Sequence, residues 1–133
     1  MNSDELPFEI GEDYEKWEFD LDIIEGEKLK ACDSYYYRRR LSFWGVGADS
    51  VEMIFCLDIL QVVIIKFNKC KLDHSQHISQ LMTIHYQKKA SEIPNKEIYI
   101  ISQNMEIWLL ESPSKLLILI YGNTQYLTKL DHT

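Results

Sequence analysis

The most constraining feature of this sequence is a dense apolar run, VEMIFCLDILQVVIIKF, at residues 51–67. It contains four consecutive β-branched residues, Val62–Ile65, which lose side-chain freedom in a helix and pack well on a pleated sheet. Asp58 is the only acid in the middle of the run, so we predict a reversal within Leu57–Leu60. The strands of the resulting hairpin are Val51–Cys56 and Leu60–Phe67. The turn has neither Gly nor Asn, which leaves its register open.

The same run is a core element and not a membrane anchor. It carries Glu52, Asp58 and Lys66, and it is shorter than the roughly 20 apolar residues that a spanning helix needs. A chain of 133 residues fits one domain, and a hydrophobic content of 46% is too high for disorder. We expect a single domain over residues 1–133, frayed at 1–7 and ending in a tail or a last helical turn at 123–133.

Three cysteines, Cys32, Cys56 and Cys70, are an odd number and include no Cys-x-x-Cys pair. No charged and apolar leader with a small-residue cleavage site precedes them. This pattern predicts a protein of the reducing cytoplasm.

The net charge of −7 is concentrated at the start of the chain. Residues 1–33 hold twelve acids and three lysines, a balance of −9. A field of this sign repels nucleic-acid phosphates and anionic lipids, so we expect no direct nucleic-acid binding and no membrane binding there. The same field attracts a basic protein.

Apolar and acidic residues alternate from Trp17 to Ile23 (WEFDLDI). This period of two predicts an edge strand with one apolar face and one acidic face. A helical alternative, spaced from Tyr14, leaves Phe19 and Ile23 on the polar side. The segment 29–48 follows after a turn at Gly26; its aromatic residues favour strands, and its glycines near residue 45 favour a bend.

After the hairpin, the sequence predicts one amphipathic helix and a meander. Asp73 is a suitable N-cap for apolar residues that recur with helical spacing from Ile78, so the helix covers 73–87. Three strands follow, at Ile98–Ser102, Met105–Glu111 and Leu116–Tyr121. The last has no polar residue and is expected at the centre of the sheet. The predicted fold class is α+β: a mainly antiparallel sheet of six or seven strands packed by one helix.

The sequence offers no complete catalytic or metal-binding constellation. Cys70, His74 and His77 have the spacing Cys-x3-His-x2-His, but a structural zinc site needs four ligands and no second half is visible. The cysteines and His85 lie in no nucleophile motif. We therefore predict a protein that is not an enzyme and binds no metal or cofactor, with these three residues as the only metal candidates.

Arg38–Arg40 directly follow three tyrosines, a combination that can hold phosphates and stack on bases. The acidic first quarter of the chain can instead pair with these arginines inside the same fold. We therefore expect an internal charge match at this position.

The acidic stretch near the N-terminus is bordered by aromatic residues, and it predicts a docking face for a basic partner. Carboxylates steer such a partner, and aromatic side chains commonly dominate interface energetics. The candidate residues are Asp13, Tyr14, Glu15, Trp17, Glu18, Asp20, Asp22, Glu25 and Tyr36. We expect an inhibitor, such as an immunity protein or antitoxin, that presents carboxylates where a nuclease toxin binds phosphates.

Two other functions stay open. The first is a small-molecule-binding or catalytic domain with a pocket between sheet and helix near His85. The second is a structural subunit whose apolar edge strand pairs with a copy of itself. The sequence does not decide between a monomer and a homodimer.

Overall fold

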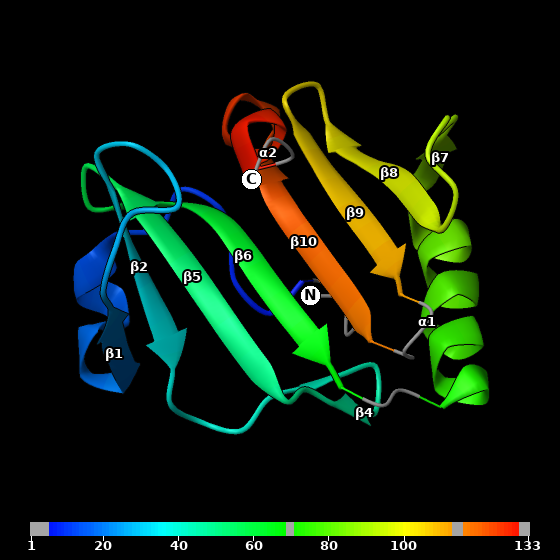
Figure 1. The fold of residues 1–133 in the computed structure, drawn as a ribbon, viewed down its shortest axis with the longest axis horizontal. Coiled ribbons are helices and arrows are strands. Elements are labelled where there is room, and N and C mark those ends of the chain that lie inside the picture. Colours follow the sequence, from blue (N-terminus) through cyan, green and yellow to red (C-terminus); the bar gives the residue numbers. More distant parts are fainter. Residues whose placement is uncertain (1–5, 69–70, 113–115, 131–133) are drawn as a thin grey trace.

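The computed structural model describes residues 6–68, 71–112 and 116–130. These residues form an antiparallel sheet of eight strands in the order β1-β2-β5-β6-β10-β9-β8-β7, and a separate two-stranded sheet, β3-β4 (Figure 1). The strands of the large sheet are β1 (Leu21–Ile24), β2 (Cys32–Tyr37), β5 (Ser50–Cys56), β6 (Ile59–Phe67), β7 (Gln87–Lys89), β8 (Lys96–Ser102), β9 (Met105–Glu111) and β10 (Leu117–Asn123). The small sheet consists of β3 (Ser42–Phe43) and β4 (Val46–Gly47). The α+β class is confirmed, but the expected six or seven strands are too few.

In the described residues, two α-helices and two single turns of 3-10 helix accompany the sheet. They are η1 (Tyr14–Lys16), η2 (Glu18–Asp20), α1 (Leu72–His85) and α2 (Thr124–Leu130). Helix α1 matches the predicted helix to within two residues at each end. Its N-cap is Lys71 and not Asp73, which lies in the first helical turn, where a negative charge is favoured by the helix dipole. The C-terminal segment, expected as a tail or a last helical turn, forms α2, so two helices and not one pack on the sheet.

The predicted hairpin of strands β5 and β6 is confirmed, with a turn tighter than expected. Leu57 and Asp58 alone make the reversal, and both have a left-handed backbone, with φ of 53° and 65°. Two such residues match the twist of a hairpin, which is why Asn-Gly pairs are favoured there. Here Leu57 and Asp58 adopt that conformation; Asp tolerates it, whereas Leu does not favour it, so the fold imposes the turn on Leu57.

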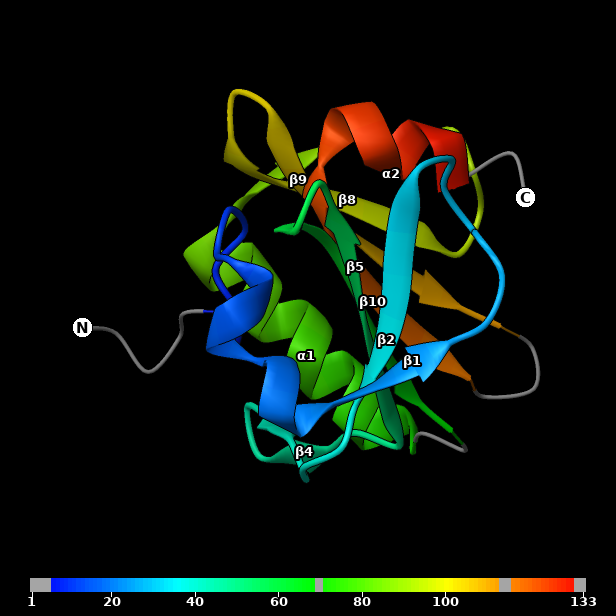
Figure 2. The ribbon, with the colours of Figure 1, turned by 90° about the vertical axis from the view of Figure 1, so that its left-hand side faces the viewer.

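The sheet buries a core on each of its faces. On one face, α1 and the N-terminal segment pack against the sheet; Ile78 and Met82 of the helix are fully buried beside Tyr99 of β8. Figure 2 views the sheet from its β1 side, with α1 and the N-terminal segment on one side of the strands. On the other face, Leu127 of α2 and Leu29 of the β1–β2 loop cover a second cluster.

Both predictions about strand position are confirmed. Strand β10 is central, between β6 and β9, and β1 is at an edge. Gly122 of β10 is needed for the close approach to β6, because a Cβ atom there would lie 2.1 Å from the backbone oxygen of Gln61. The bend expected near Gly45 is the turn of the small hairpin β3-β4, where Trp44 and Gly45 both have positive φ.

The N-terminal segment is attached to the sheet from Phe8 onward. Phe8 is buried, its N–H donates to the Tyr121 hydroxyl at 3.0 Å, and that hydroxyl donates to the Phe8 carbonyl at 2.9 Å. Of the segment expected to be frayed, residues 1–5 lie outside the described part of the chain. The remaining two lead directly into an anchored position.

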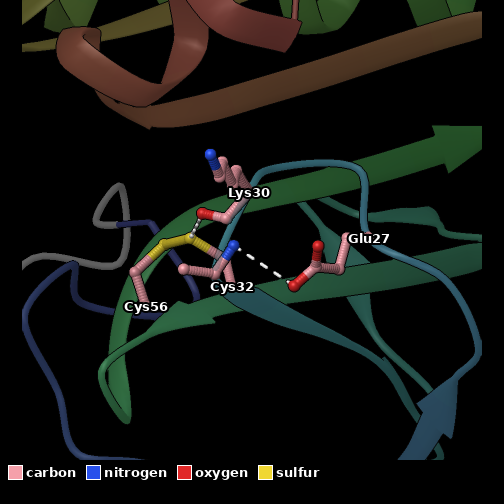
Figure 3. The surroundings of a disulfide bond; sticks show 5 residues. Glu27, Lys30, Cys32 and Cys56 are labelled. Atoms are coloured by element: carbon pink, nitrogen blue, oxygen red, sulfur yellow. Dashed lines mark hydrogen bonds between the residues drawn. A yellow bond between two sulfur atoms is a disulfide. The ribbon is translucent and has the colours of Figure 1, made fainter.

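Cys32 and Cys56 form a disulfide between the adjacent strands β2 and β5 (Figure 3). Both cysteines are buried, and they are direct cross-strand partners with Cα atoms 4.3 Å apart. The loop before β2 is held beside the bond, because the Ala31 N–H donates to the Glu27 carboxylate at 3.2 Å. Cysteine spacing along the chain did not reveal this pair. The expectation of a reducing compartment rested on the absence of a disulfide bond.

The strand predicted from Trp17 to Ile23 is largely wrong. Only the part from Leu21 is a strand; before it, backbone bonds from Trp17 to Tyr14 and from Asp20 to Trp17 form the two 3-10 turns. Tyr14, Trp17 and Leu21 all pack against the core, as the helical alternative required. Phe19 and Ile23 are 84% and 68% exposed, which is the cost attached to that alternative.

In the described part of the chain, no helix is long and apolar enough to cross a membrane.

Candidate functional site

The tip of the β5–β6 hairpin is joined to the N-terminal segment by backbone hydrogen bonds. The Tyr14 N–H donates to the Asp58 carbonyl at 2.8 Å, and Asp13 forms an isolated bridge with Ile59. One residue further along, the Leu60 N–H donates to the Glu12 carbonyl at 2.9 Å. The start of η1 and the hairpin tip are therefore fixed relative to each other, although they are far apart in the sequence.

This junction places four carboxylates around one hollow, which we call the acidic hollow. It has a volume of about 420 Å³, and the residues that line it are Asp13, Tyr14, Glu15, Glu18 and Asp58. All four carboxylate residues are exposed, and Tyr14 is half-buried. Within the described chain, no salt bridge involves any of the four. The hollow therefore combines a concentrated negative charge with a preformed shape.

The ring of Tyr14, which lines the acidic hollow, packs against two other aromatic rings. The ring of Tyr14 lies 5.1 Å from that of Tyr35 and 5.5 Å from that of Phe55, centroid to centroid. The pKa of Tyr35 is raised to about 12, first by burial and then by the neighbouring Tyr14 and the negative charges of Asp33 and Asp58. Asp58, which lines the hollow, is thus one of the negative charges that act on Tyr35.

Two exposed apolar side chains are sequence neighbours of acids that line the hollow. Leu57, directly before Asp58, is 90% exposed at the hairpin tip, and Phe19, directly after Glu18, is exposed to a similar degree. An apolar residue with a left-handed backbone at a fully exposed turn is unfavourable in the free protein. Aromatic residues such as Phe are enriched in the buried core of protein interfaces.

Asp20 and Asp22, predicted for the docking face, are instead engaged within the chain. Arg39 Nε lies 2.5 Å from Asp20 Oδ1, and Arg38 Nε lies 3.6 Å from Asp22 Oδ2. The ion pair with Asp20 raises the pKa of the Arg39 guanidinium. Arg38 and Arg39 therefore form the internal charge match that the sequence suggested.

The other three predicted partner-binding residues lie apart from the hollow. Trp17 points into the core, with its ring 5.0 Å from that of Phe8 and its Nε1 bonded to Glu12. Glu25 is exposed in the β1–β2 loop. Tyr36 is 48% exposed on the opposite sheet face from Tyr35. Of the nine predicted residues, Asp13, Tyr14, Glu15 and Glu18 come together.

The hollow between α1 and the sheet does not contain His85. It has a volume of about 410 Å³, and its lining includes Ser79 and Glu97. Glu97 accepts hydrogen bonds from the hydroxyls of Ser79 at 2.8 Å and Tyr99 at 2.6 Å. His85 lies elsewhere on α1, exposed, with its ring 5.7 Å from that of Trp44.

The structure describes two of the three candidate metal ligands. His74 and His77 are exposed on α1, and the ring of His77 contacts the Trp44 carbonyl at 3.1 Å. Cys70 lies outside the described residues. Among those that are described, no three His, Cys, Asp or Glu side chains are grouped so that they could hold a metal ion.

Sequence reasoning missed Asp58 and Leu57 as site residues. Asp58 was noticed as the single acid in an apolar run, and that observation predicted the turn. What the sequence could not give is the position of the turn beside η1, which depends on the backbone bonds between Glu12, Tyr14 and the hairpin. An acid isolated in a strand-forming run is nevertheless the signal that could have identified the residue.

Comparisons of the chain with protein-family models, curated proteins and solved structures found no significant match.

Proposed function

We propose that this protein is a non-enzymatic binding protein that occupies a basic partner, as an immunity protein or antitoxin occupies a nuclease toxin. The observation that carries the proposal is the acidic hollow. Its four carboxylates make no salt bridge with any described cation. Surface carboxylates left uncompensated and close together repel one another, and a cationic partner relieves that repulsion.

The backbone around the acidic hollow favours a preorganised interface. Asp58 is positioned by the hairpin turn, and Tyr14 by its bond to that turn, so neither needs to be ordered when a partner binds. Preorganisation reduces the entropic cost of association. A partner that inserts arginine or lysine side chains into the hollow would meet carboxylates already in place.

The exposed side chains of Leu57 and Phe19 supply the apolar component of the proposed interface. Charge steers a partner and sets the rate of association, whereas buried apolar anchors slow dissociation. A partner with an apolar pocket rimmed by basic residues has the chemistry that matches this surface. Among basic proteins we propose a nuclease as the partner, because its basic groups bind phosphates and carboxylates can mimic the negative charge of phosphates.

The proposal can be tested with the double variant Glu18→Gln/Asp58→Asn, which removes two charges from the hollow and keeps side-chain size. The partner would be captured at low salt, beginning with the protein encoded beside this one, and its Kd measured against salt concentration by titration calorimetry. We expect the variant to bind at least about tenfold more weakly and with a shallower salt dependence. We expect the association rate constant to fall by a larger factor than the dissociation rate constant rises.

A matched control removes the same two charges elsewhere. Glu92→Gln/Asp73→Asn alters two exposed acids outside the hollow, so its Kd should stay within about twofold of the original value. Equal weakening in both variants would show that only net charge matters. Failure to bind any basic protein at low salt would overturn the proposal.

A further inference from the structure

The two edges of the large sheet are built differently. Strand β7 is short, fully exposed and carries Lys88 and Lys89, which pair with Glu97 and Glu106. Lysines on a short edge strand are a common protection against pairing with another chain. Strand β1, at the opposite edge, has no lysine and exposes the large apolar side chain of Ile23. Figure 2 shows β1 in front of the other strands on this side of the molecule.

The outward backbone groups of β1 can be identified from its pairing with β2. The Arg38 N–H donates to the Asp20 carbonyl at 2.8 Å, and Leu21 and Ile23 face Tyr37 and Tyr35. In an antiparallel pair, every second residue bonds to its neighbour, so Asp22 bonds to β2 while Leu21 and Ile23 direct their N–H and C=O groups to the open side. These groups form a template for another strand.

We propose that β1 pairs in antiparallel fashion with β1 of a second copy of this chain, with Ile23 opposite Ile23 on a two-fold axis. In this register the outward N–H and C=O of the two Ile23 residues satisfy each other. Each Asp22 lies opposite Ile24 of the other copy. The exposed apolar side chain at position 23 is then covered by its equivalent, and the two sheets become continuous.

Charge disfavours the neighbouring register that is centred on Asp22. A shift that centred the axis on Asp22 would place two carboxylates directly opposite each other, which is destabilising. The arginines near β1 reduce the repulsion between two copies, because Arg38 and Arg39 pair with Asp22 and Asp20 within each copy. Two acidic chains can therefore meet at this edge, whereas the acidic hollow, which has no such compensation, would repel its equivalent.

The first test is sedimentation of the full chain from about 5 µM to about 500 µM, the range in which a small interface associates. We expect a monomer–dimer equilibrium, and a loss of dimer of at least about tenfold in Kd for Ile23→Lys. The control Ile84→Lys changes an exposed isoleucine of α1 and should dimerise normally. Circular dichroism would check that both variants fold.

The register is tested by disulfide cross-linking in a Cys70→Ala background. Ile23→Cys places two thiols on the axis, and a Cα separation of about 5.5 Å suits a disulfide, so rapid formation of a covalent dimer is expected. The control Asp22→Cys should cross-link much more slowly. A monomer at every concentration, or a dimer unaffected by Ile23→Lys, would overturn the proposal; preferential cross-linking at position 22 would overturn the register. None of these results depends on a basic partner.

Discussion

Leu57 has a backbone conformation that its residue type disfavours. Its φ of 53° is usual for Gly, Asn or Asp and costs a larger side chain about 1 kcal/mol or more. Burial does not offset this cost, because the side chain is 90% exposed. The fold tolerates it since the hairpin ladder and the bond from Tyr14 to Asp58 both require the turn.

Replacing Leu57 with Asn should therefore stabilise the protein. Asn adopts the left-handed conformation readily, so we expect the free energy of unfolding to rise by about 0.5–1 kcal/mol. Urea denaturation measures this change. The control Leu57→Ala removes the same apolar surface but keeps the backbone penalty and should change stability little; equal gains in both variants would contradict the explanation.

Tyr35 should make folding sensitive to alkaline pH. Its pKa is raised from 10.0 to about 12 in the folded chain, so the unfolded chain releases this proton at lower pH. The stability that Tyr35 contributes is therefore complete below pH 10.0 and is lost as the pH rises to about 12. Tyr35→Phe should flatten this part of the curve of unfolding free energy against pH, measured by urea denaturation. An unchanged slope would contradict the assignment. Tyr99 and Tyr121, whose pKa values are also raised, contribute to the slope in both proteins.

At the scale of elements, the acidic segment shows how two periodicities can coexist in one stretch. Alternation of apolar and acidic residues favours a strand, while Tyr14, Trp17 and Leu21 are also spaced for a turn of helix. The structure follows the helical pattern up to Asp20, where the coiled chain packs the partly buried Trp17 against Phe8, and the strand pattern from Leu21 onward. Phe19 is left exposed as a result.

The disulfide links two neighbouring strands and should contribute substantially to stability. Closing a loop between residues 24 apart in the sequence corresponds to about 3.5 kcal/mol in the chain-entropy model. We expect the double variant Cys32→Ala/Cys56→Ala, or reduction of the original protein, to lower the free energy of unfolding by roughly that amount. The measurement is urea denaturation with and without reductant.

The matched control is Cys70→Ala, which leaves the bond between Cys32 and Cys56 intact and should remain sensitive to reductant. The double variant should be insensitive. Alkylation of the denatured, unreduced protein should label a single cysteine. Labelling of all three would show that the bond is absent under those conditions.

Over the whole molecule, the fold divides a charge that is continuous in the sequence. The first 33 residues carry −9, but Asp20 and Asp22 pair with arginines at the β1 edge, while Asp13, Glu15 and Glu18 gather with Asp58. One segment thus supplies a neutralised edge and an uncompensated acidic hollow. The proposed contacts with a second copy and with a basic partner correspond to these two surfaces.

The sequence by itself determined the elements that contiguous patterns encode. The hairpin, α1 and β8–β10 were predicted nearly to their observed bounds, because periodicity and N-terminal or turn signals act within a few neighbouring residues. The edge position of β1 and the central position of β10 followed from the polarity of their faces.

Only the tertiary structure decided which distant residues meet. The pairing of Cys32 with Cys56, the position of Asp58 beside Tyr14 and the capture of Asp20 and Asp22 by arginines all depend on how separate elements pack. Local periodicity carries no information about such contacts, because they form only when the buried faces of the sheet select one arrangement of the chain. The sequence therefore predicted the N-terminal acids of the candidate site, and the tertiary structure added the hairpin tip.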